Sequence, residues 1–271
     1  VESNVKYRDA EDEGTPYGPV KVYGFLDIDS SLEKKRHKLE EALWYLNAIR
    51  ELPQPVYREI EDQNWMTAWK EHYQPIEIGK KILILPAWME QKDMSRIAVK
   101  IDPSMAFGTG PHPSTHLCLE LVEDYTKPGK ALIYIGCGSG ILSIAALKLG
   151  AKHALAVDID AESVKETQKA CEDNGVADRV EAGQGSVPEI NGGKFSIRQA
   201  PVVLANILAP ILIRLFDAGM ADTIEQGGVI ILAGILAEQG QNVRESAEFR
   251  GLVYVEERHK GDWVALVMKR P

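Results

Sequence analysis

The hydrophobic pattern is clearest between residues 131 and 160, where a strand period gives way to a helix period and back again. Ala131–Ile135 is a short apolar run, typical of a strand that is buried on both faces. A glycine-rich turn follows it, and apolar residues then recur at helical spacing up to Gly150, a residue type that often ends helices. A second apolar run, Leu155–Val157, ends on Asp158. The pattern therefore predicts a strand–helix–strand unit with parallel strands.

The same alternation continues to the end of the chain. Helices are predicted at 161–174, 207–220 and 236–249, strands at 180–182, 201–205, 229–233, 252–256 and 263–268, and a turn at Gly227-Gly228. A polar turn around His259–Gly261 joins the last two strands, so we expect them to pair antiparallel. An antiparallel hairpin that finishes an otherwise parallel sheet is the arrangement of class I methyltransferases. We therefore predict an α/β fold of that class, a Rossmann-like doubly wound sheet.

The first part of the chain has a weaker pattern. Residues 1–16 are charged and lack periodicity, so we expect them to be frayed. Further along, the pattern predicts a strand over 20–28, a helix over 32–50 that starts with a Ser30–Glu33 capping box, and an edge strand over 56–60. These elements predict a small α+β domain over 1–61, a linker helix and connecting strand over 62–94, and the doubly wound domain over 95–271.

Composition narrows the function classes. The chain has 271 residues, 45% of them hydrophobic and 26% charged, which is ordinary for a globular protein. No apolar run approaches the roughly 20 residues of a membrane span, and the polar N-terminus argues against a signal peptide, so we expect no membrane partner. Three scattered cysteines without a C-x-x-C pair favour a reducing, cytoplasmic location. The formal net charge of −9 disfavours direct nucleic-acid binding and suits a basic protein substrate.

The glycine turn carries the first candidate chemistry. Gly136, Gly138 and Gly140 form G-x-G-x-G, whereas the dinucleotide fingerprint needs a glycine where Ile141 stands. S-adenosylmethionine has no pyrophosphate, so a looser loop can serve it. Asp158 follows Gly136 by 22 residues and is placed to accept hydrogen bonds from both ribose hydroxyls. A purely structural glycine turn is the alternative, but the aspartate favours a nucleoside-containing cofactor.

Other candidate residues lie in loops next to predicted strands. Ala106–His116 contains two glycines and two prolines just before the strand–helix–strand unit, which favours a loop that covers the cofactor. Its candidate cofactor contacts are Phe107, Gly108, Thr109 and Thr115. Ser186 lies near the expected position of an adenine. His112 and His116 are four residues apart, but Pro113 stands where a zinc H-E-x-x-H motif needs glutamate, so we predict no metal site.

Six segments together resemble one family. AFGTGPHPST, IGCGSGIL, VDID, LANIL, GGVIILAGIL and GDWVAL, in this order, resemble the bacterial methyltransferases of a large-subunit ribosomal protein, the PrmA family. The resemblance covers the chain from about Trp65 to its C-terminus. It implies a monomeric two-domain enzyme, in which the N-terminal domain grips the ribosomal protein. The C-terminal domain binds S-adenosylmethionine and methylates lysine ε-amino groups and, in some members, the N-terminal α-amine.

The resemblance also implies residue roles. Thr115 would contact the cofactor, Gly136 would approach its methionine part, and Asp158 would hold the ribose. Asn206, just after the strand at 201–205, would face the methyl group and the incoming nitrogen, and is the candidate catalytic residue. A turn residue after a strand is the alternative for Asn206.

Two positions depart from the family pattern. Tyr134 stands where the family usually has aspartate, and Pro111 stands where a polar residue usually precedes His112. Tyr134 motivates an alternative, an S-adenosylmethionine-binding protein with impaired turnover or another substrate. A nucleic-acid or small-molecule methyltransferase is a further alternative, although Ile207-Leu208-Ala209 replace the Pro-Pro-aromatic sequence that adenine methylation favours after Asn206. A nicotinamide dehydrogenase is the last alternative.

Overall fold

The structure is a computed structural model. It describes residues 2–6, 15–21, 31–47, 55–57, 75–91, 94–102 and 112–271. The chain divides into two compact units, Val1–Trp65 and Met66–Pro271.

The first unit begins with a strand pair. β1 (Glu2–Lys6) pairs antiparallel with β2 (Thr15–Lys21). The expectation of a frayed segment is therefore wrong for residues 2–6 and 15–16, and the other residues of 1–16 lie outside the described residues. Strand pairing uses backbone groups, and charged side chains do not prevent it. Residues 20 and 21 of the strand expected over 20–28 end β2, and residues 22–28 lie outside the described residues. Residues 55–57 are not part of a strand, and the rest of the edge strand expected there lies outside the described residues.

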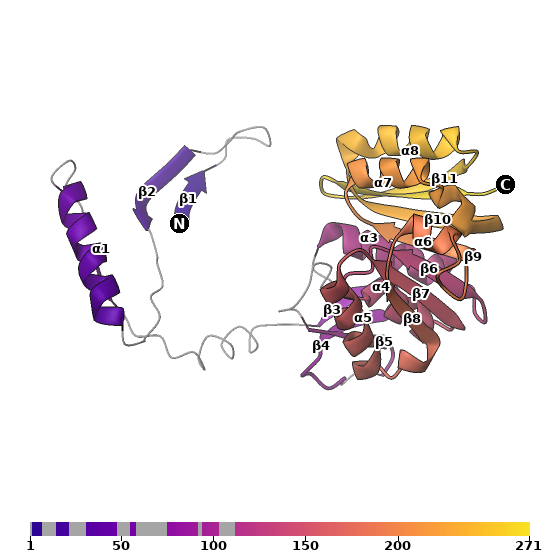
Figure 1. Ribbon diagram of the computed structural model, residues 1–271, viewed down its shortest axis with the longest axis horizontal. Helices are drawn as coiled ribbons and strands as arrows, with labels where there is room; N and C mark the ends of the chain where they lie inside the picture. Colours follow the sequence, from indigo (N-terminus) through magenta and orange to yellow (C-terminus); the bar gives the residue numbers. More distant parts are fainter. Residues whose placement is uncertain are drawn as a thin grey trace. The chain divides into compact units, whose positions relative to one another are not determined.

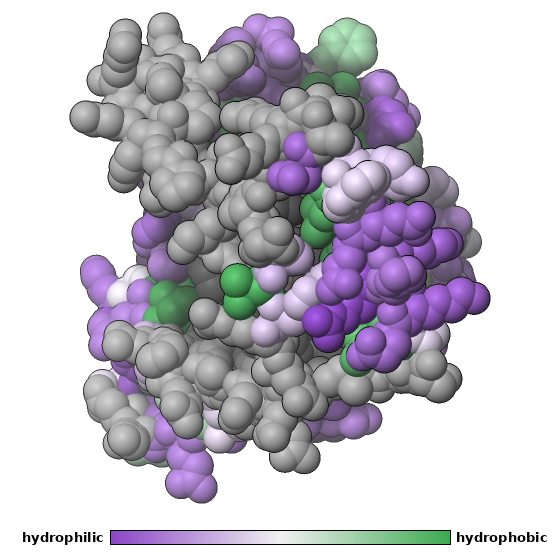
Figure 2. Space-filling view, turned by 90° about the vertical axis from the view of Figure 1, so that its left-hand side faces the viewer, coloured by the Kyte–Doolittle hydropathy of each residue, from purple (hydrophilic) through white to green (hydrophobic). Residues whose placement is uncertain are grey.

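The helix predicted in the first unit is present as α1 (Leu32–Asn47). None of its residues is buried, and Trp44 is 68% exposed. Arg36 and Glu40 form an ion pair of 3.1 Å one turn apart, a geometry that supports an exposed helix. On the face that Figure 2 shows, most of the coloured residues are hydrophilic. The predicted capping residue Ser30 lies outside the described residues.

The second unit is built on a seven-stranded sheet, in the order β11-β12-β10-β9-β6-β7-β8 (Figure 1). Its parallel strands are β6 (Ala131–Ile135), β7 (His153–Asp158), β8 (Val180–Gln184), β9 (Ala200–Asn206) and β10 (Ile224–Leu236). β12 (Trp263–Lys269) pairs antiparallel with both β10 and β11 (Val253–Lys260). The terminal antiparallel hairpin is confirmed, and with it the class I methyltransferase fold.

Helices cover both faces of this sheet. One face packs against α3 (Pro113–Tyr125), α4 (Ile141–Lys148) and α5 (Ala161–Asp173), and the other against α6 (Val187–Asn191), α7 (Ala209–Asp217) and α8 (Gly240–Phe249). Successive residues of β6 enter opposite cores: Tyr134 packs on the α3 side and Ile133 on the α7 side. This double burial is the reason for the unbroken apolar runs in the parallel strands.

Three predictions in the C-terminal half need correction. The helix expected over 207–220 is shorter, because α7 ends at Asp217 and a 3₁₀ turn, Met220–Thr223, follows. The helix expected over 236–249 starts at Gly240, after a 3₁₀ turn at Ala237–Gln239. The turn expected at Gly227-Gly228 is an irregularity inside β10, where the register shifts between Ile224 and Val229. A glycine with positive φ, here Gly227 at +75°, allows a strand to bulge without ending it.

The second unit also contains a three-stranded sheet, built partly from the segment expected to be a linker. β3 (Ile76–Ile78) pairs antiparallel with β4 (Ile82–Pro86), which pairs parallel with β5 (Ile97–Ile101). The Glu123 carboxylate of α3 accepts a hydrogen bond from the backbone N–H of Lys81 at 2.9 Å. The Asn174 side chain bonds to both the N–H and the C=O of Lys100, at 2.8 and 2.7 Å. These bonds fasten the small sheet to the helices beside the main sheet.

Candidate functional site

Three candidate residues meet because three parallel strands end at one edge of the sheet. β6 lies between β7 and β9, with Ile135 opposite both Val157 and Ala205. Gly136, Asp158 and Asn206 come at the ends of these strands, so they lie side by side. The carboxyl edge of a doubly wound sheet is where ligands bind in such folds.

The glycine loop is held by backbone hydrogen bonds. Gly136, Gly138 and Gly140 have φ values of +73°, +50° and +76°, a region that favours glycine. The N–H groups of Gly136 and Cys137 both donate to the carbonyl of Val157, at 2.8 and 3.0 Å. Gly140 then begins α4 as its N-cap. The three glycines therefore shape a tight turn between β6 and α4, as the G-x-G-x-G spacing predicts.

Asp158 joins this loop to the next strand. One carboxylate oxygen accepts from the N–H of Gly138 and the other from the N–H of Asp160, each at 3.0 Å. A carboxylate offers about four acceptor positions, so each oxygen retains capacity for a further donor. Its remaining acceptors suit the two hydroxyls of a ribose. The backbone carbonyl of Asp158 accepts from Gly185 at 2.8 Å, which brings Ser186 to the same edge.

Asn206 meets Thr115 although 91 residues separate them. The Asn206 amide nitrogen lies 3.5 Å from the Thr115 hydroxyl, at the outer limit of a hydrogen bond. Thr115 is 1% exposed in the first turn of α3. That turn is capped by His112, whose Nδ1 accepts from the N–H of Ser114 at 3.2 Å, and whose ring packs edge-on against Trp263. Burial lowers the pKa of His112, which favours the neutral, accepting imidazole.

Ile207 is a site residue that the sequence analysis missed. A Cβ added to Gly136 would lie 2.6 Å from Ile207 Cγ2, and one added to Gly234 would lie 2.6 Å from the Ile207 carbonyl oxygen. The N–H of Ile207 also donates to Ala233 at 3.1 Å. Ile207 is thus packed between two glycines, and the preceding Asn206 is held in place. An isolated glycine within the apolar run of a strand, as at Gly234, is the signal that indicates such a close backbone approach.

Tyr134 is 4% exposed and packs into the core on the α3 side of the sheet. Burial raises the pKa of Tyr134 well above 10, with smaller contributions from Cys118, Cys137 and Asp158. A neutral phenol therefore occupies the position at which the resemblance leads us to expect aspartate. Phe107, Gly108, Thr109 and Pro111 lie outside the described residues, so their roles stay predictions.

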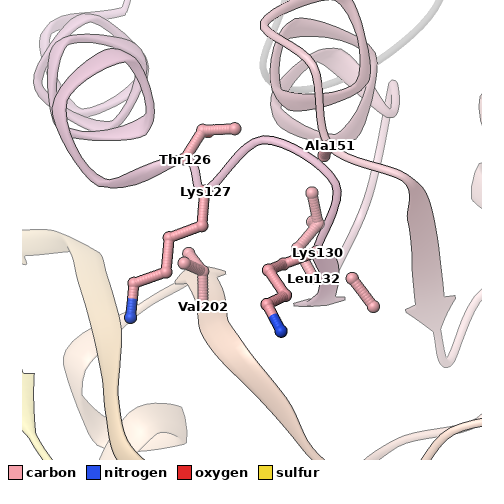
Figure 3. Close-up of a pocket in the computed structure, with 7 residues that line it drawn as sticks. Thr126, Lys127, Lys130, Leu132, Ala151 and Val202 are labelled. Carbon is pink, nitrogen blue, oxygen red and sulfur yellow. The ribbon is translucent and has the colours of Figure 1, made fainter.

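Two hollows lie away from this edge. Figure 3 shows residues that line a small pocket at the starts of β6 and β9, among them Thr126, Lys127 and Lys130. A surface cleft of about 410 Å³ lies beside Arg198 and Asp222. Because the first hollow is at the amino ends of the strands, it is separated from the glycine loop by the length of the sheet. The candidate residues lie at the opposite, carboxyl edge.

The described part of the chain contains neither a candidate membrane span nor a candidate metal cluster. None of the helices there combines the length and the apolar character needed to cross a bilayer. In the same residues, no three His, Cys, Asp or Glu side chains gather as a metal site would require.

A family model and two relatives with similar sequences carry the same description. The family model "Ribosomal protein L11 methyltransferase (PrmA)" matches residues 2–271. A ribosomal protein L11 methyltransferase of Geobacter sp. (strain M21) is 40% identical, over 96% of this chain and 84% of its own. The protein of the same name from Chloroflexus aurantiacus is 35% identical, over 94% of this chain and 84% of its own.

A solved structure agrees with the sequence comparisons. The ribosomal protein L11 methylase of Lactobacillus delbrueckii subsp. bulgaricus is 27% identical with a TM-score of 0.64, and covers 73% of this chain and 99% of its own. The methyl donor of such enzymes is S-adenosylmethionine, and the glycine loop, Asp158 and Asn206 provide a site that fits it. The chain belongs to the ribosomal protein L11 methyltransferase (PrmA) family.

Proposed function

We propose that this chain transfers methyl groups from S-adenosylmethionine to amino groups of ribosomal protein L11, chiefly lysine ε-amino groups. The observation that carries the proposal is the meeting of Gly136, Asp158 and Asn206 at the ends of three adjacent strands. It combines a nucleoside-binding carboxylate with an amide that can orient a nitrogen. Family membership supplies the substrate class.

In this proposal the residues act mainly by alignment. When bound, the sulfonium of S-adenosylmethionine supplies both the methyl group and its leaving group. Asp158 holds the ribose, and the glycine loop leaves room for the methionine part. The Asn206 side-chain oxygen accepts an N–H of the substrate amine and so directs its lone pair. In-line positioning of this kind accounts for several kcal/mol of barrier reduction.

The amine must be neutral to react. A lysine amine has an ordinary pKa of about 10.4. Both desolvation in the site and a nearby positive charge lower that pKa, because each disfavours the ammonium form. Since no carboxylate is needed as a base in this scheme, we expect the rate to rise with pH until the bound amine is fully deprotonated.

The two units would divide the work. Residues 1–61 would grip the ribosomal protein, and 95–271 would bind the donor and transfer the methyl group. Residues 62–94 would connect the two and also supply β3 and β4 to the second unit. A chain of formal net charge −9 suits a basic partner, and this favours electrostatic steering of the substrate. We expect the enzyme to act as a monomer in the cytoplasm, without direct contact to nucleic acid.

Mass spectrometry of purified ribosomal protein L11 after incubation with the chain and a deuterated methyl donor tests the proposal. We expect labelled lysines with the full chain, and labelling about 100-fold slower with Asn206→Ala. Donor binding by calorimetry without transfer would instead favour the alternative in which Tyr134 impairs turnover. Stabilisation by NAD, and not by S-adenosylmethionine, would favour a dehydrogenase.

A chain lacking residues 1–61 tests the division of work. We expect it to bind S-adenosylmethionine with unchanged affinity and to lose activity on intact ribosomal protein. A truncated chain that methylates the intact protein at the full rate would contradict the gripping role.

A further inference from the structure

A polar side chain lies on the buried face of α5, beneath the glycine loop. The buried residues of α5 are Val164, Thr167 and Cys171, spaced as one helical face. Thr167 is 0% exposed. A buried hydroxyl requires a partner, since an unsatisfied one costs about 1–3 kcal/mol. The identity of that partner indicates what Thr167 does.

The partner of Thr167 is the glycine loop itself. Its hydroxyl donates to the carbonyl oxygen of Gly138 at 2.8 Å, and it lies 3.2 Å from Cys137 Sγ. A Cβ added to Gly140 would lie 2.9 Å from the Thr167 methyl carbon and 3.2 Å from its Cα. The loop therefore rests directly on this one residue of α5. Burial raises the pKa of the Cys137 thiol to about 12, so a neutral thiol is the second neighbour.

The hydrogen bonds continue from the loop to Asp158. Gly138 accepts from Thr167 through its carbonyl and donates through its N–H to Asp158 Oδ2 at 3.0 Å. The other carboxylate oxygen is held by the N–H of Asp160 at 3.0 Å. Because Gly138 has a φ of +50° and no side chain, its orientation depends on these bonds. A buried group on α5 thereby influences the direction of the carboxylate on β7.

We propose that Thr167 is a positioning residue for the cofactor, whose hydroxyl fixes Gly138 so that the Asp158 carboxylate presents its remaining lone pairs to the ribose. The inference rests on the proposed ribose-binding role of Asp158. Thr167 itself does not touch the cofactor in this account. It acts through Gly138 in the way that outer groups orient the direct ligands of a site.

Thr167→Val tests the proposal, because it keeps the shape of the side chain and removes the donor. By calorimetry with S-adenosylhomocysteine, we expect the dissociation constant to rise roughly tenfold, the scale of one weakened hydrogen bond between the ribose and the Asp158 carboxylate. The kcat at saturating donor should stay near the wild-type value, so the loss appears in KM for the donor. Thr167→Ser keeps the hydroxyl and should restore affinity to within about twofold of wild type.

Thr223→Val is a matched control, because Thr223 is also 0% exposed and its hydroxyl donates to a backbone carbonyl, that of Met220, at 2.7 Å. We expect it to lower the melting temperature without changing donor affinity. A folded Thr167→Val with wild-type affinity would overturn the inference. If Thr167→Val does not fold, Thr167→Ala is measured instead, and wild-type donor affinity in that variant would likewise overturn the inference.

A double-mutant cycle separates the inference from the proposed function. If Thr167 acts through Asp158, then adding Thr167→Val to Asp158→Ala should change affinity by less than about twofold. A full tenfold loss in that background would overturn the inference and leave the ribose-binding role intact. Wild-type affinity in Asp158→Ala alone would instead overturn the ribose-binding role.

Discussion

The two sides of the site are held in different ways. On the β7 side, Asp158 and the glycine loop are fixed by backbone hydrogen bonds of 2.8–3.0 Å. On the β9 side, Asn206 is placed by the packing of Ile207 and has a 3.5 Å contact with Thr115. If Asp158 binds the donor and Asn206 orients the amine, as we propose, the donor side is preorganised, while the amide on the transfer side can adjust to an incoming amine. Preorganisation reduces the cost of binding, and adjustable groups suit a substrate that must enter and leave.

The largest expected effect concerns the transfer side. Asn206→Ala should lower kcat about 100-fold, the scale of a reacting group that loses its alignment, and should leave donor affinity nearly unchanged. Steady-state kinetics combined with donor calorimetry measures both. Asn191→Ala, which removes an amide bonded to the Gly219 carbonyl far from the site, is the control. Equal losses in kcat and donor affinity would contradict the separation of the two sides.

Asp158→Ala should act in the opposite way, on donor binding. Its removal should weaken affinity by about 1–3 kcal/mol, the scale of lost charged hydrogen bonds. Asp160→Ala is the matched control, because Asp160 caps α5 through its side chain and contacts Asp158 only through its backbone among the described bonds. That control should cost about 1 kcal/mol of folding stability and leave affinity unchanged. If Asp160→Ala lost as much donor affinity as Asp158→Ala, the ribose would have to bind elsewhere.

Gly234→Ala tests whether packing alone holds Asn206. A Cβ there would collide with the backbone of Ile207, and the φ of +79° adds strain of about 1–3 kcal/mol. We expect kcat to fall roughly tenfold, because a shift of the Asn206 backbone by a fraction of an ångström disturbs alignment. Gly251→Ala has a similar φ of +83° and open space around it, so it isolates the strain. If both variants kept full kcat, the Ile207 packing would have no role in transfer.

The smallest effect is expected at Thr115. A contact of 3.5 Å is weak, so Thr115→Val should change kcat by no more than about threefold. Thr115→Ser, which keeps the hydroxyl, should match wild type in the same assay. A loss comparable to that of Asn206→Ala would mean that the pair tightens during the reaction, and that both sides of the site are preorganised in the working complex.

Local rules were enough to predict where the glycine loop and Asp158 lie. The apolar run of β6, the glycine spacing and the strand-end Asp158 lie within 30 residues, and parallel strands place their carboxyl ends together. The resemblance to the family, which the comparisons confirm, supplied Asn206 and Thr115. Where the sequence analysis was wrong, as in the frayed N-terminus, the cause was backbone pairing that side-chain periodicity does not report.

The sequence by itself determined the fold class, the order of the strands along the chain and the residue types at the strand ends, because these follow from hydrophobic period and turn chemistry. Only the tertiary structure decided which distant side chains hold the residues at the strand ends. Thr167 bonds to Gly138 across 29 residues, and Ile207 packs against both Gly136 and Gly234. A helix or strand period shows that a side chain faces inward, but the neighbour that it meets depends on how the layers pack, and that is fixed when the whole sheet has formed.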